Sequence, residues 1–278
     1  MSTQNAQQIE YWNGVVGERW ARLQEDIDRN LGRITQAFIP FAAARPGMRV
    51  LDIGCGCGTT SLTFARQVQP GGSVTGIDMS VPMLAVARSR AQAAGADIAF
   101  VEADASTYGF QPMFDLAASR FGVMFFADPV AAFANIRKSL APGGRLAFVC
   151  WRSVPENGWA FTPITAARAL LPPQETPDPH APGPFAFADG KRVEKILASA
   201  GFRDIVIEKF DATMEMGATA EDAARDALNI GPLARAAAEL DENAREKIRT
   251  VVAAAMARYA TPDGVSAPVA CWFVSARG

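Results

Sequence analysis

Residues Val50–Thr60 have the sequence VLDIGCGCGTT. The stretch opens with a short apolar run, as in a buried strand, and continues with three glycines at alternate positions. Glycine adopts positive φ angles without strain and lets a ligand lie against bare backbone, where amide N–H groups meet it. The stretch therefore predicts a strand, a ligand-binding loop and a helix in succession.

Short apolar runs alternate with helical stretches on both sides of this loop, which is typical of a parallel sheet built from βαβ units. We therefore expect an α/β fold with a doubly wound, seven-stranded, mostly parallel, Rossmann-like sheet. Insertions after the fifth and sixth strands would form a cap. The predicted strands are residues 49–53, 73–77, 98–102, 114–119, 145–151, 205–210 and 267–275.

The segment before the sheet, residues 1–45, is expected to be a helical lid. Between Ile9 and Phe41 apolar residues recur every three or four positions, which traces one helical face. Gly14 and Gly17 predict a break into two helices, which leaves a short leading piece.

The rest of the chain divides into three segments. Residues 46–151 carry the ligand-binding core of the sheet, and residues 189–278 complete the sheet around a helical insertion at 212–266. Residues 152–188 contain seven prolines from position 163 onward, so we expect no long regular element there. Their aromatic residues favour a substrate cap over a linker.

Composition excludes several classes of function. With 27 basic and 29 acidic residues in 278, the net charge of −2 gives no field for a polyanion, and nucleic acid is not an expected partner. The single histidine excludes a zinc site of several histidines, and we expect no metal. The polar start and the lack of a long apolar run predict a cytoplasmic chain without a membrane span, and its four cysteines fit reduced thiols.

Two acidic residues follow later strands at the same edge of the sheet as the glycine loop. Asp78 ends the second strand, where a carboxylate accepts hydrogen bonds from ribose hydroxyls, and Asp104 follows the third. Both also fit the role of helix caps. The loop spacing is Gly-x-Gly-x-Gly, which differs from the dinucleotide fingerprint, so a nicotinamide oxidoreductase is the weaker alternative.

At this point the sequence resembles the class I S-adenosylmethionine-dependent methyltransferases. The stretches Ile77-Asp78-Met79-Ser80, Met83-Leu84 and Leu140-Ala141-Pro142-Gly143-Gly144 are most similar to the ubiquinone and menaquinone biosynthesis branch. The resemblance is strong over residues 46–151 and looser over the last two strands. It implies a Rossmann-like methyltransferase fold with S-adenosylmethionine as cofactor.

The resemblance also implies roles for individual residues. Gly54, Cys55 and Gly56 would line the methionine portion of the cofactor. Asp78 would hold the ribose, and Asp52 would orient the loop. The remaining implied contacts are Gly58 in the loop, Met79 and Met83 near the adenine, Asp104 and Ala105 at its edge, and Ser119 and Arg120 beside the methyl group.

The acceptor side is expected to be apolar and lined with aromatic rings. A ring that faces the sulfonium gains cation–π stabilisation, although several of these rings also fit a core role. The predicted pocket residues are Tyr11, Trp12, Trp20, Trp151, Trp159 and Phe187, with Phe185 beside them.

Three side chains are candidates for a role in the reaction. His180 has a suitable reference pKa for a general base, although a histidine in a surface loop is also common. Arg120 or Arg152, at the carboxyl edge of the sheet, could pair with an anionic acceptor, although the favoured interpretation of Arg152 is a solvated side chain.

The predicted function is methyl transfer to a small apolar or aromatic, phenol- or quinone-like acceptor, on O, C, N or S. A protein that binds S-adenosylmethionine without turnover remains an alternative. The apolar face from Ile248 to Tyr259 predicts packing on its own sheet or on a second copy, as in a homodimer.

Overall fold

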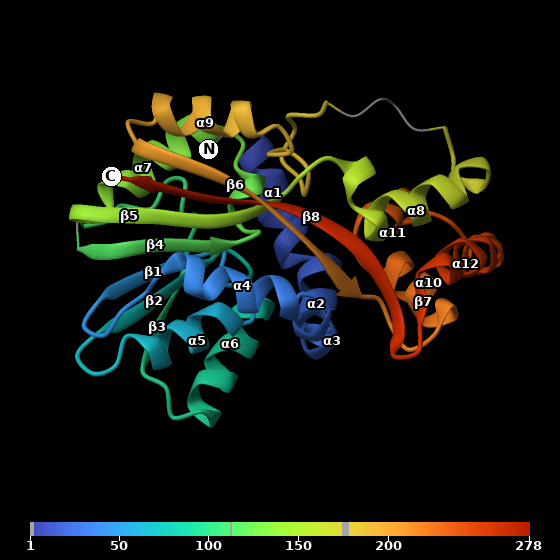
Figure 1. Cartoon of the computed structure of the whole chain (residues 1–278), viewed down its shortest axis with the longest axis horizontal. Helices are drawn as coiled ribbons and strands as arrows, with labels where there is room; N and C mark the ends of the chain where they lie inside the picture. The colour runs from blue at the N-terminus through green and yellow to red at the C-terminus, as the bar shows by residue number, and fades with distance from the viewer. Residues whose placement is uncertain (1–2, 112, 174–177) are drawn as a thin grey trace.

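A twisted β-sheet forms the centre of the computed structural model, which describes residues 3–111, 113–173 and 178–278 (Figure 1). The strand order is β3-β2-β1-β4-β5-β8-β6, and a short β7 pairs only with β8. The strands are β1 (Arg49–Ile53), β2 (Ser73–Asp78), β3 (Ile98–Glu102), β4 (Phe114–Arg120), β5 (Leu140–Trp151), β6 (Arg203–Glu215), β7 (Ala260–Thr261) and β8 (Gly264–Arg277).

The sheet topology confirms the predicted α/β class. Strands β1 to β5 pair in parallel, whereas β8 runs antiparallel to β5 and β6. Between β1 and its neighbours β2 and β4 the strand order reverses, and ligands of open α/β sheets bind at the carboxyl ends of the strands beside such a point. The two-residue β7 is the one strand beyond the predicted seven.

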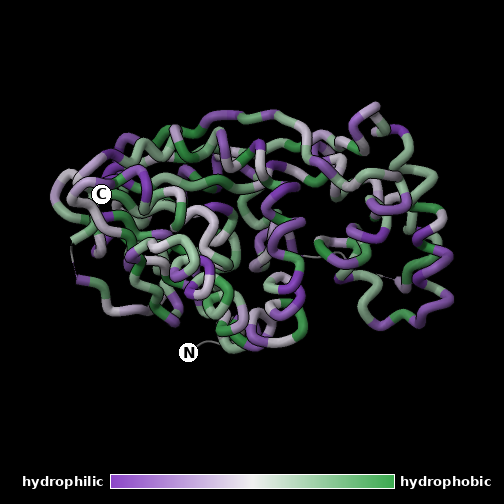
Figure 2. The backbone as a smooth tube through the Cα atoms, turned by 90° about the horizontal axis from the view of Figure 1, so that it is seen from below, coloured by the Kyte–Doolittle hydropathy of each residue, from purple (hydrophilic) through white to green (hydrophobic). Residues whose placement is uncertain are grey.

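Helices pack on both faces of the sheet and at its carboxyl end (Figure 1). Hydrophobic stretches run along the central strands, and hydrophilic ones lie mostly on the outer turns (Figure 2). No helix among the described residues combines the length and the apolar character needed to span a bilayer. The helices are α1 (Thr3–Asn13), α2 (Val15–Arg22), α3 (Gln24–Asn30), α4 (Gly32–Ala42), α5 (Thr59–Gln67), α6 (Val81–Ala93), α7 (Pro129–Lys138), α8 (Gly158–Ala167), α9 (Gly190–Ser199), α10 (Ala220–Asn229), α11 (Pro232–Ala236) and α12 (Glu242–Met256), with short 3₁₀ turns at Val123–Phe125, Val154–Glu156, Arg168–Leu170 and Ala257–Tyr259.

The N-terminal segment forms four helices, α1 to α4, where the sequence predicted two. The first break falls at Gly14, as expected, but Gly17 lies buried inside α2. A Cβ at Gly17 would stand 1.9 Å from the carbonyl oxygen of Trp12, so this glycine lets α2 pack against the end of α1. Further breaks occur at Leu23 and Leu31, between α2, α3 and α4.

The prediction of no long regular element in residues 152–188 is wrong for α8. This ten-residue helix contains Pro163 in its interior, where the missing N–H normally breaks a helix. Trp159, Ala160 and Pro163 are buried, and α8 packs against α12. Tertiary packing therefore outweighs the local cost. The later described prolines lie outside regular helices.

A second lobe is built on the long strands β6 and β8. These two strands of the sheet extend beyond the other strands to α8 and α10–α12 (Figure 1). Ile248, Val252 and Met256 of α12 are fully buried, and this helix packs against α8 and α10. The apolar face predicted at Ile248–Tyr259 thus finds its cover within the chain, on helices of the lobe rather than on the sheet.

The core on one face of the sheet depends on Phe133 of α7. Its ring is fully buried and lies 5.5 Å from Phe148, 6.0 Å from Phe187 and 6.4 Å from Phe202, between ring centroids. We expect Phe133→Ala to lower the free energy of unfolding by about 3–5 kcal/mol, because it leaves a cavity among rings. Urea denaturation measures this loss. The control Phe161→Ala removes a 41% exposed ring and should cost far less; equal losses would contradict the assignment.

Candidate functional site

The glycine loop connects β1 to α5, and two of its glycines are required by close packing. Gly54, Gly56 and Gly58 have φ angles of +65°, +53° and +82°. A Cβ at Gly54 would lie 2.7 Å from the Cα of Gly122, in the loop after β4. A Cβ at Gly58 would approach Ala87 of α6 to 3.1 Å, so Gly58 fits the loop onto α6.

Asp52 lies under this loop and is completely buried. Its Oδ2 accepts hydrogen bonds from the hydroxyls of Thr60 at 2.7 Å and Ser61 at 2.5 Å. Its Oδ1 is buried and has no partner among the described residues. Burial raises the pKa of Asp52 to about 6, against the lowering effect of the two hydroxyls. The site thus contains a carboxylate oxygen that a ligand donor would satisfy.

Asp78 joins the ends of β1 and β2. Its Oδ2 accepts the Gly56 N–H at 2.8 Å and its Oδ1 the Ser80 N–H at 2.9 Å. Burial raises the pKa of Asp78, whereas these amides lower it. Each carboxylate oxygen has a second lone pair, so both retain the capacity to accept from a ligand hydroxyl. Cys55, between the two acids in the chain, packs its Sγ against Gly76 of β2.

Hydrogen bonds hold the ends of β3 and β4, locally at β3 and across to β1 at β4. Asp104 accepts the N–H and the hydroxyl of Ser106, both at 2.8 Å, as expected of the capping alternative. The hydroxyl of Ser119 donates to the Ile53 carbonyl at 2.7 Å and accepts the Gly122 N–H at 3.2 Å. Ser119 therefore ties the loop after β4 to the end of β1.

Helix α1 lies on the residues that follow Asp78. Asn13 donates to the Met79 carbonyl at 2.8 Å and accepts the Val81 N–H at 2.9 Å. The hydroxyl of Ser80 donates to the Trp12 carbonyl at 2.7 Å. The end of α1 is thereby fixed at the edge where Met79 lies, and the buried Met83 is two residues further along α6 than Val81.

A cluster centred on Asp28 of α3 holds the N-terminal helices to the glycine loop. Asp28 accepts the Thr59 hydroxyl at 2.6 Å, pairs with Arg90 at 3.0 Å and lies 3.7 Å from Arg120. Arg90 also donates to the Cys57 carbonyl in the loop at 2.8 Å. A single carboxylate therefore connects α3 with the loop, α6 and the end of β4.

Arg120 is directed toward the N-terminal helices. Besides Asp28 it contacts Thr35 of α4, whose hydroxyl accepts a hydrogen bond at 2.8 Å. Burial lowers the pKa of Arg120, whereas Asp28 and Asp52 raise it. The nearby carboxylates of Asp28 and Asp52 already balance the charge of Arg120. A contact with the methyl group or the acceptor stays a prediction.

The aromatic residues form two groups. Around Trp12 of α1, ring centroids lie 5.2 Å from Tyr11, 5.8 Å from Trp20 and 5.1 Å from Phe125. Around Trp151 at the end of β5, Phe121 stacks at 4.1 Å, and Trp159, itself 6.0 Å from Phe185, lies at 5.0 Å. Phe187 is separate, since its 1% exposed ring packs in the core.

The two remaining candidates lie in different surroundings. Arg152 is buried and pairs with Asp211 at 2.6 Å and with Glu156, so it is neither solvated nor unpaired. His180 has a 58% exposed side chain whose Nδ1 is 4.0 Å from Asp178. It lines a cavity with residues of α7 and α9, and no described hydrogen bond or ion pair connects it to the glycine loop.

Asp28, Asn13 and Gly122 are site residues that the sequence analysis missed. Asp28 and Asn13 lie in helices that were predicted from their apolar residues alone. No local pattern in the sequence indicated the polar contacts of these two side chains. Gly122 did have one, because a glycine two residues after the end of a strand can mark a close approach of two backbones.

Comparison with known proteins explains the arrangement. Residues 50–144 match the family model described as a methyltransferase domain. Over this stretch the chain is similar to the class I S-adenosylmethionine-dependent methyltransferases. This domain contains the glycine loop, Asp52, Asp78 and Asp104, and S-adenosylmethionine is the cofactor of its type.

Relatives support this assignment over part of the chain. The chain is 33% identical over 135 residues to demethylmenaquinone methyltransferase of Thermus thermophilus. The aligned stretch covers 48% of this chain and 61% of that protein. It is 37% identical over 135 residues to aklanonic acid methyltransferase of a Streptomyces species, covering 47% and 56%. The matches thus span little more than half the length of these relatives.

One solved structure extends the similarity of fold to nearly the whole chain. Magnesium protoporphyrin IX methyltransferase from Synechocystis, with bound S-adenosylhomocysteine, superposes with a TM-score of 0.55 over 97% of this chain and 99% of its own. The sequence identity is only 17%, so the similarity concerns the fold alone. That fold includes the methyltransferase domain and the segments around it.

The residues of the methyltransferase domain fit such a cofactor. At Gly56 the nearest atom to the position of a Cβ is the Met83 sulfur at 3.8 Å, so the backbone there is more open than at Gly54. The unpartnered Oδ1 of Asp52 offers an acceptor to an ammonium or amide donor. Asp78 offers a second acceptor at the end of β2. A cationic ligand also suits a site in which two buried carboxylates lie close to each other.

The buried Asp52 predicts a pH dependence of stability. A raised folded-state pKa means that the native state binds more protons than the unfolded state between pH values of about 4 and 6, so stability falls as the pH rises through that window. A pKa near 6 against 3.8 corresponds to roughly 3 kcal/mol at pH 7. Without cofactor, we expect the free energy of unfolding of Asp52→Asn to fall much less than that of the wild type as the pH rises through this window. Asp78 contributes in the same direction and remains in the variant.

Urea unfolding at pH 4.5 and pH 7.5 measures this effect. Asp263→Asn, an exposed carboxylate in the turn between β7 and β8, is the matched control and should follow the wild type. The same decline in Asp52→Asn and the wild type would show that Asp52 is not the titrating group.

Proposed function

We propose that this protein transfers a methyl group from S-adenosylmethionine to a small apolar or aromatic acceptor. The observation that carries the proposal is the glycine loop with two buried carboxylates, Asp52 and Asp78, at the point where the strand order reverses. One of the four carboxylate oxygens there, Oδ1 of Asp52, has no partner among the described residues.

The proposed cofactor contacts follow the loop and the strand ends. Gly54, Cys55 and Gly56 would border the methionine portion through their backbone, and Asp78 would accept from the ribose hydroxyls. Met79 and Met83 would pack near the adenine, and Asp104 and Ala105 would lie at its edge. Ser119 and Gly58 would act by holding the loop in place, as their contacts indicate.

The cofactor supplies an electrophilic methyl group, so the protein must mainly position the acceptor and exclude water. Helix α1 and its aromatic group would cover the adenosine side, because Asn13 binds both Met79 and Val81. Asp28 would fix this cover through Arg90 and Arg120. Arg120 is thus proposed as a positioning residue. His180 is kept as the proposed base for an acceptor that carries a proton.

The acceptor is proposed to bind between the two aromatic groups, one on α1 and α2 and one at the end of β5. Rings on both sides suit a flat apolar molecule, phenol- or quinone-like, and a chain with a net charge of −2 offers little to a nucleic acid. The similarity to demethylmenaquinone methyltransferase and to aklanonic acid methyltransferase supports a small-molecule acceptor.

Cofactor binding is tested by calorimetry with S-adenosylhomocysteine. We expect roughly micromolar affinity for the wild type and at least tenfold weaker binding for Asp78→Asn, which loses hydrogen bonds to a charged acceptor worth about 1.5–3 kcal/mol. Asp263→Asn is the control and should bind as the wild type does. No binding by the folded wild type, or preferred binding of NAD(H), would overturn the proposal.

Turnover is tested separately, by release of S-adenosylhomocysteine with a panel of phenols, quinones, thiols and amines. A base at His180 predicts that His180→Ala lowers kcat for a phenol by about a hundredfold or more while cofactor affinity stays unchanged. Unchanged kcat would remove His180 from the mechanism. Binding without turnover of any acceptor would favour a non-catalytic role.

A further inference from the structure

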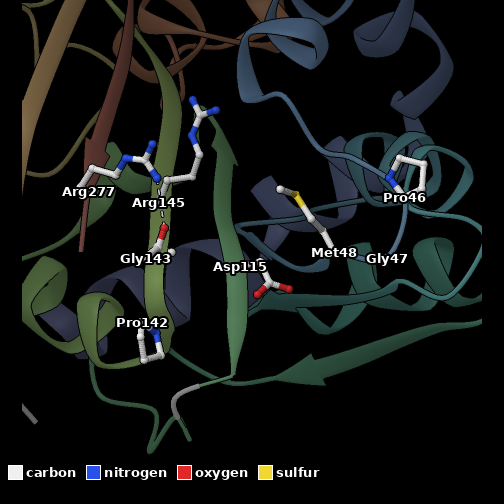
Figure 3. Close-up of a pocket in the computed structure, with 9 residues that line it drawn as sticks. Pro46, Gly47, Met48, Asp115, Pro142, Gly143, Arg145 and Arg277 are labelled. Atoms are coloured by element: carbon white, nitrogen blue, oxygen red, sulfur yellow. Dashed lines mark hydrogen bonds between the residues drawn. The ribbon is translucent and has the colours of Figure 1, made fainter.

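The amino edge of the sheet, at the opposite end from the glycine loop, contains a second cavity (Figure 3). Its volume is about 440 Å³, and the turns before β1 and at Gly143 line it together with Asp115, Arg145 and Arg277. Arg145 lies at the start of the paired part of β5, and Asp115 follows the first residue of β4. The cavity is therefore separated from the cofactor site by the length of the strands.

Three arginines lie in one row across neighbouring strands at this edge. Arg145 of β5 is directly opposite Arg277 of β8, and Arg277 is directly opposite Arg203 of β6. Residues directly opposite in antiparallel strands project from the same face of a sheet. Figure 3 shows Arg145 and Arg277 side by side on adjacent strands. Like charges in such positions destabilise a sheet, so the row carries a cost in the absence of a counter-charge.

The described residues supply little counter-charge to the row. Arg145 donates to the Phe41 carbonyl at 3.3 Å and Arg277 to the Gly143 carbonyl at 3.1 Å. Arg203 donates to an oxygen of Gly278 at 3.5 Å. Within the described ranges, none of the three lies within 4.0 Å of an Asp or Glu carboxylate.

The acid that lines the cavity is already engaged. Asp115 accepts the Arg49 N–H at 2.8 Å and pairs with the Arg49 guanidinium at 3.1 Å. Partial burial lowers the pKa of Arg145, and the charges of Arg277 and of a further cation, Arg45, lower it as well. The net charge around the cavity is therefore positive, although the chain as a whole is slightly acidic.

We propose that the row formed by Arg145, Arg277 and Arg203 binds the phosphate group of a small ligand. A guanidinium fork binds two phosphate oxygens at once, and several forks together match a dianion better than a single carboxylate. The cavity has room for a phosphate monoester. A nucleic acid is disfavoured, because its backbone needs an extended basic surface, which a chain with this charge balance does not offer.

The test is calorimetric titration of the full chain with sodium phosphate, against sodium chloride of equal ionic strength. We expect saturable binding to the wild type and at least tenfold weaker binding to Arg145→Gln/Arg277→Gln, since hydrogen bonds to a charged group are worth about 1.5–3 kcal/mol. The control Arg168→Gln/Arg258→Gln removes two exposed charges from the 3₁₀ turns of the second lobe and should bind phosphate as the wild type does.

Folding of the variants is followed by thermal denaturation without phosphate. The double variant should melt at or above the wild-type temperature, because it removes facing like charges. Arg203→Gln changes one exposed member of the row and should also weaken phosphate binding, so it provides the test if the double variant fails to fold.

Three outcomes would overturn the proposal: no saturable phosphate binding by the wild type, equal affinity in the row variants, or binding of a single-stranded oligonucleotide but not of phosphate. Affinity for S-adenosylhomocysteine should be the same in all these variants. Loss of phosphate binding with intact cofactor binding therefore separates this site from the proposed methyl transfer.

Discussion

The contact between Gly54 and Gly122 fixes the geometry of the whole carboxyl edge. A Cβ on either glycine would stand 2.7 Å from backbone atoms of the other loop or of β1, so no other residue fits at either position. The same contact places Phe121, at a φ of +62°, so that its ring stacks on Trp151 with an interplanar angle of 12°. Positive φ is strained for a bulky residue. The glycine loop and the aromatic residues proposed to face the acceptor are therefore positioned by one backbone contact.

Electrostatics at this edge follows from the same close packing. Asp52 is fully buried under the loop, and two hydroxyls stabilise only one of its carboxylate oxygens. Burial of an under-satisfied carboxylate is unfavourable, and such groups concentrate at functional sites. The positive charges nearby belong to Arg120 and Arg90, and both are paired with Asp28. A cationic cofactor would supply a positive charge near the buried carboxylate of Asp52.

Local patterns predicted the donor half of this structure well. Apolar runs, glycines and the two acids lie in contiguous stretches, so β1, the loop and the position of Asp78 follow from the sequence. The Asp28 cluster does not, because its partners Thr59, Arg90 and Arg120 are 31 to 92 residues away and meet only in the packed structure. The helix around Pro163 was not predicted for a related reason. Its stability comes from packing within the second lobe, and local helix propensity carries no information on that packing.

The arginine row illustrates the same limit at the other edge. Arg145, Arg203 and Arg277 are separated by long stretches of chain, and only the register of two antiparallel strand pairs aligns them. That register also places Trp151 beside Cys271, six residues further along β5, which is about 20 Å from the row. Exposed charges are screened over about 8 Å at physiological ionic strength, so the row exerts little field on the glycine loop. Acids at one edge and arginines at the other can therefore bind ligands of opposite charge independently, and any coupling between the two must pass through the strands that they share.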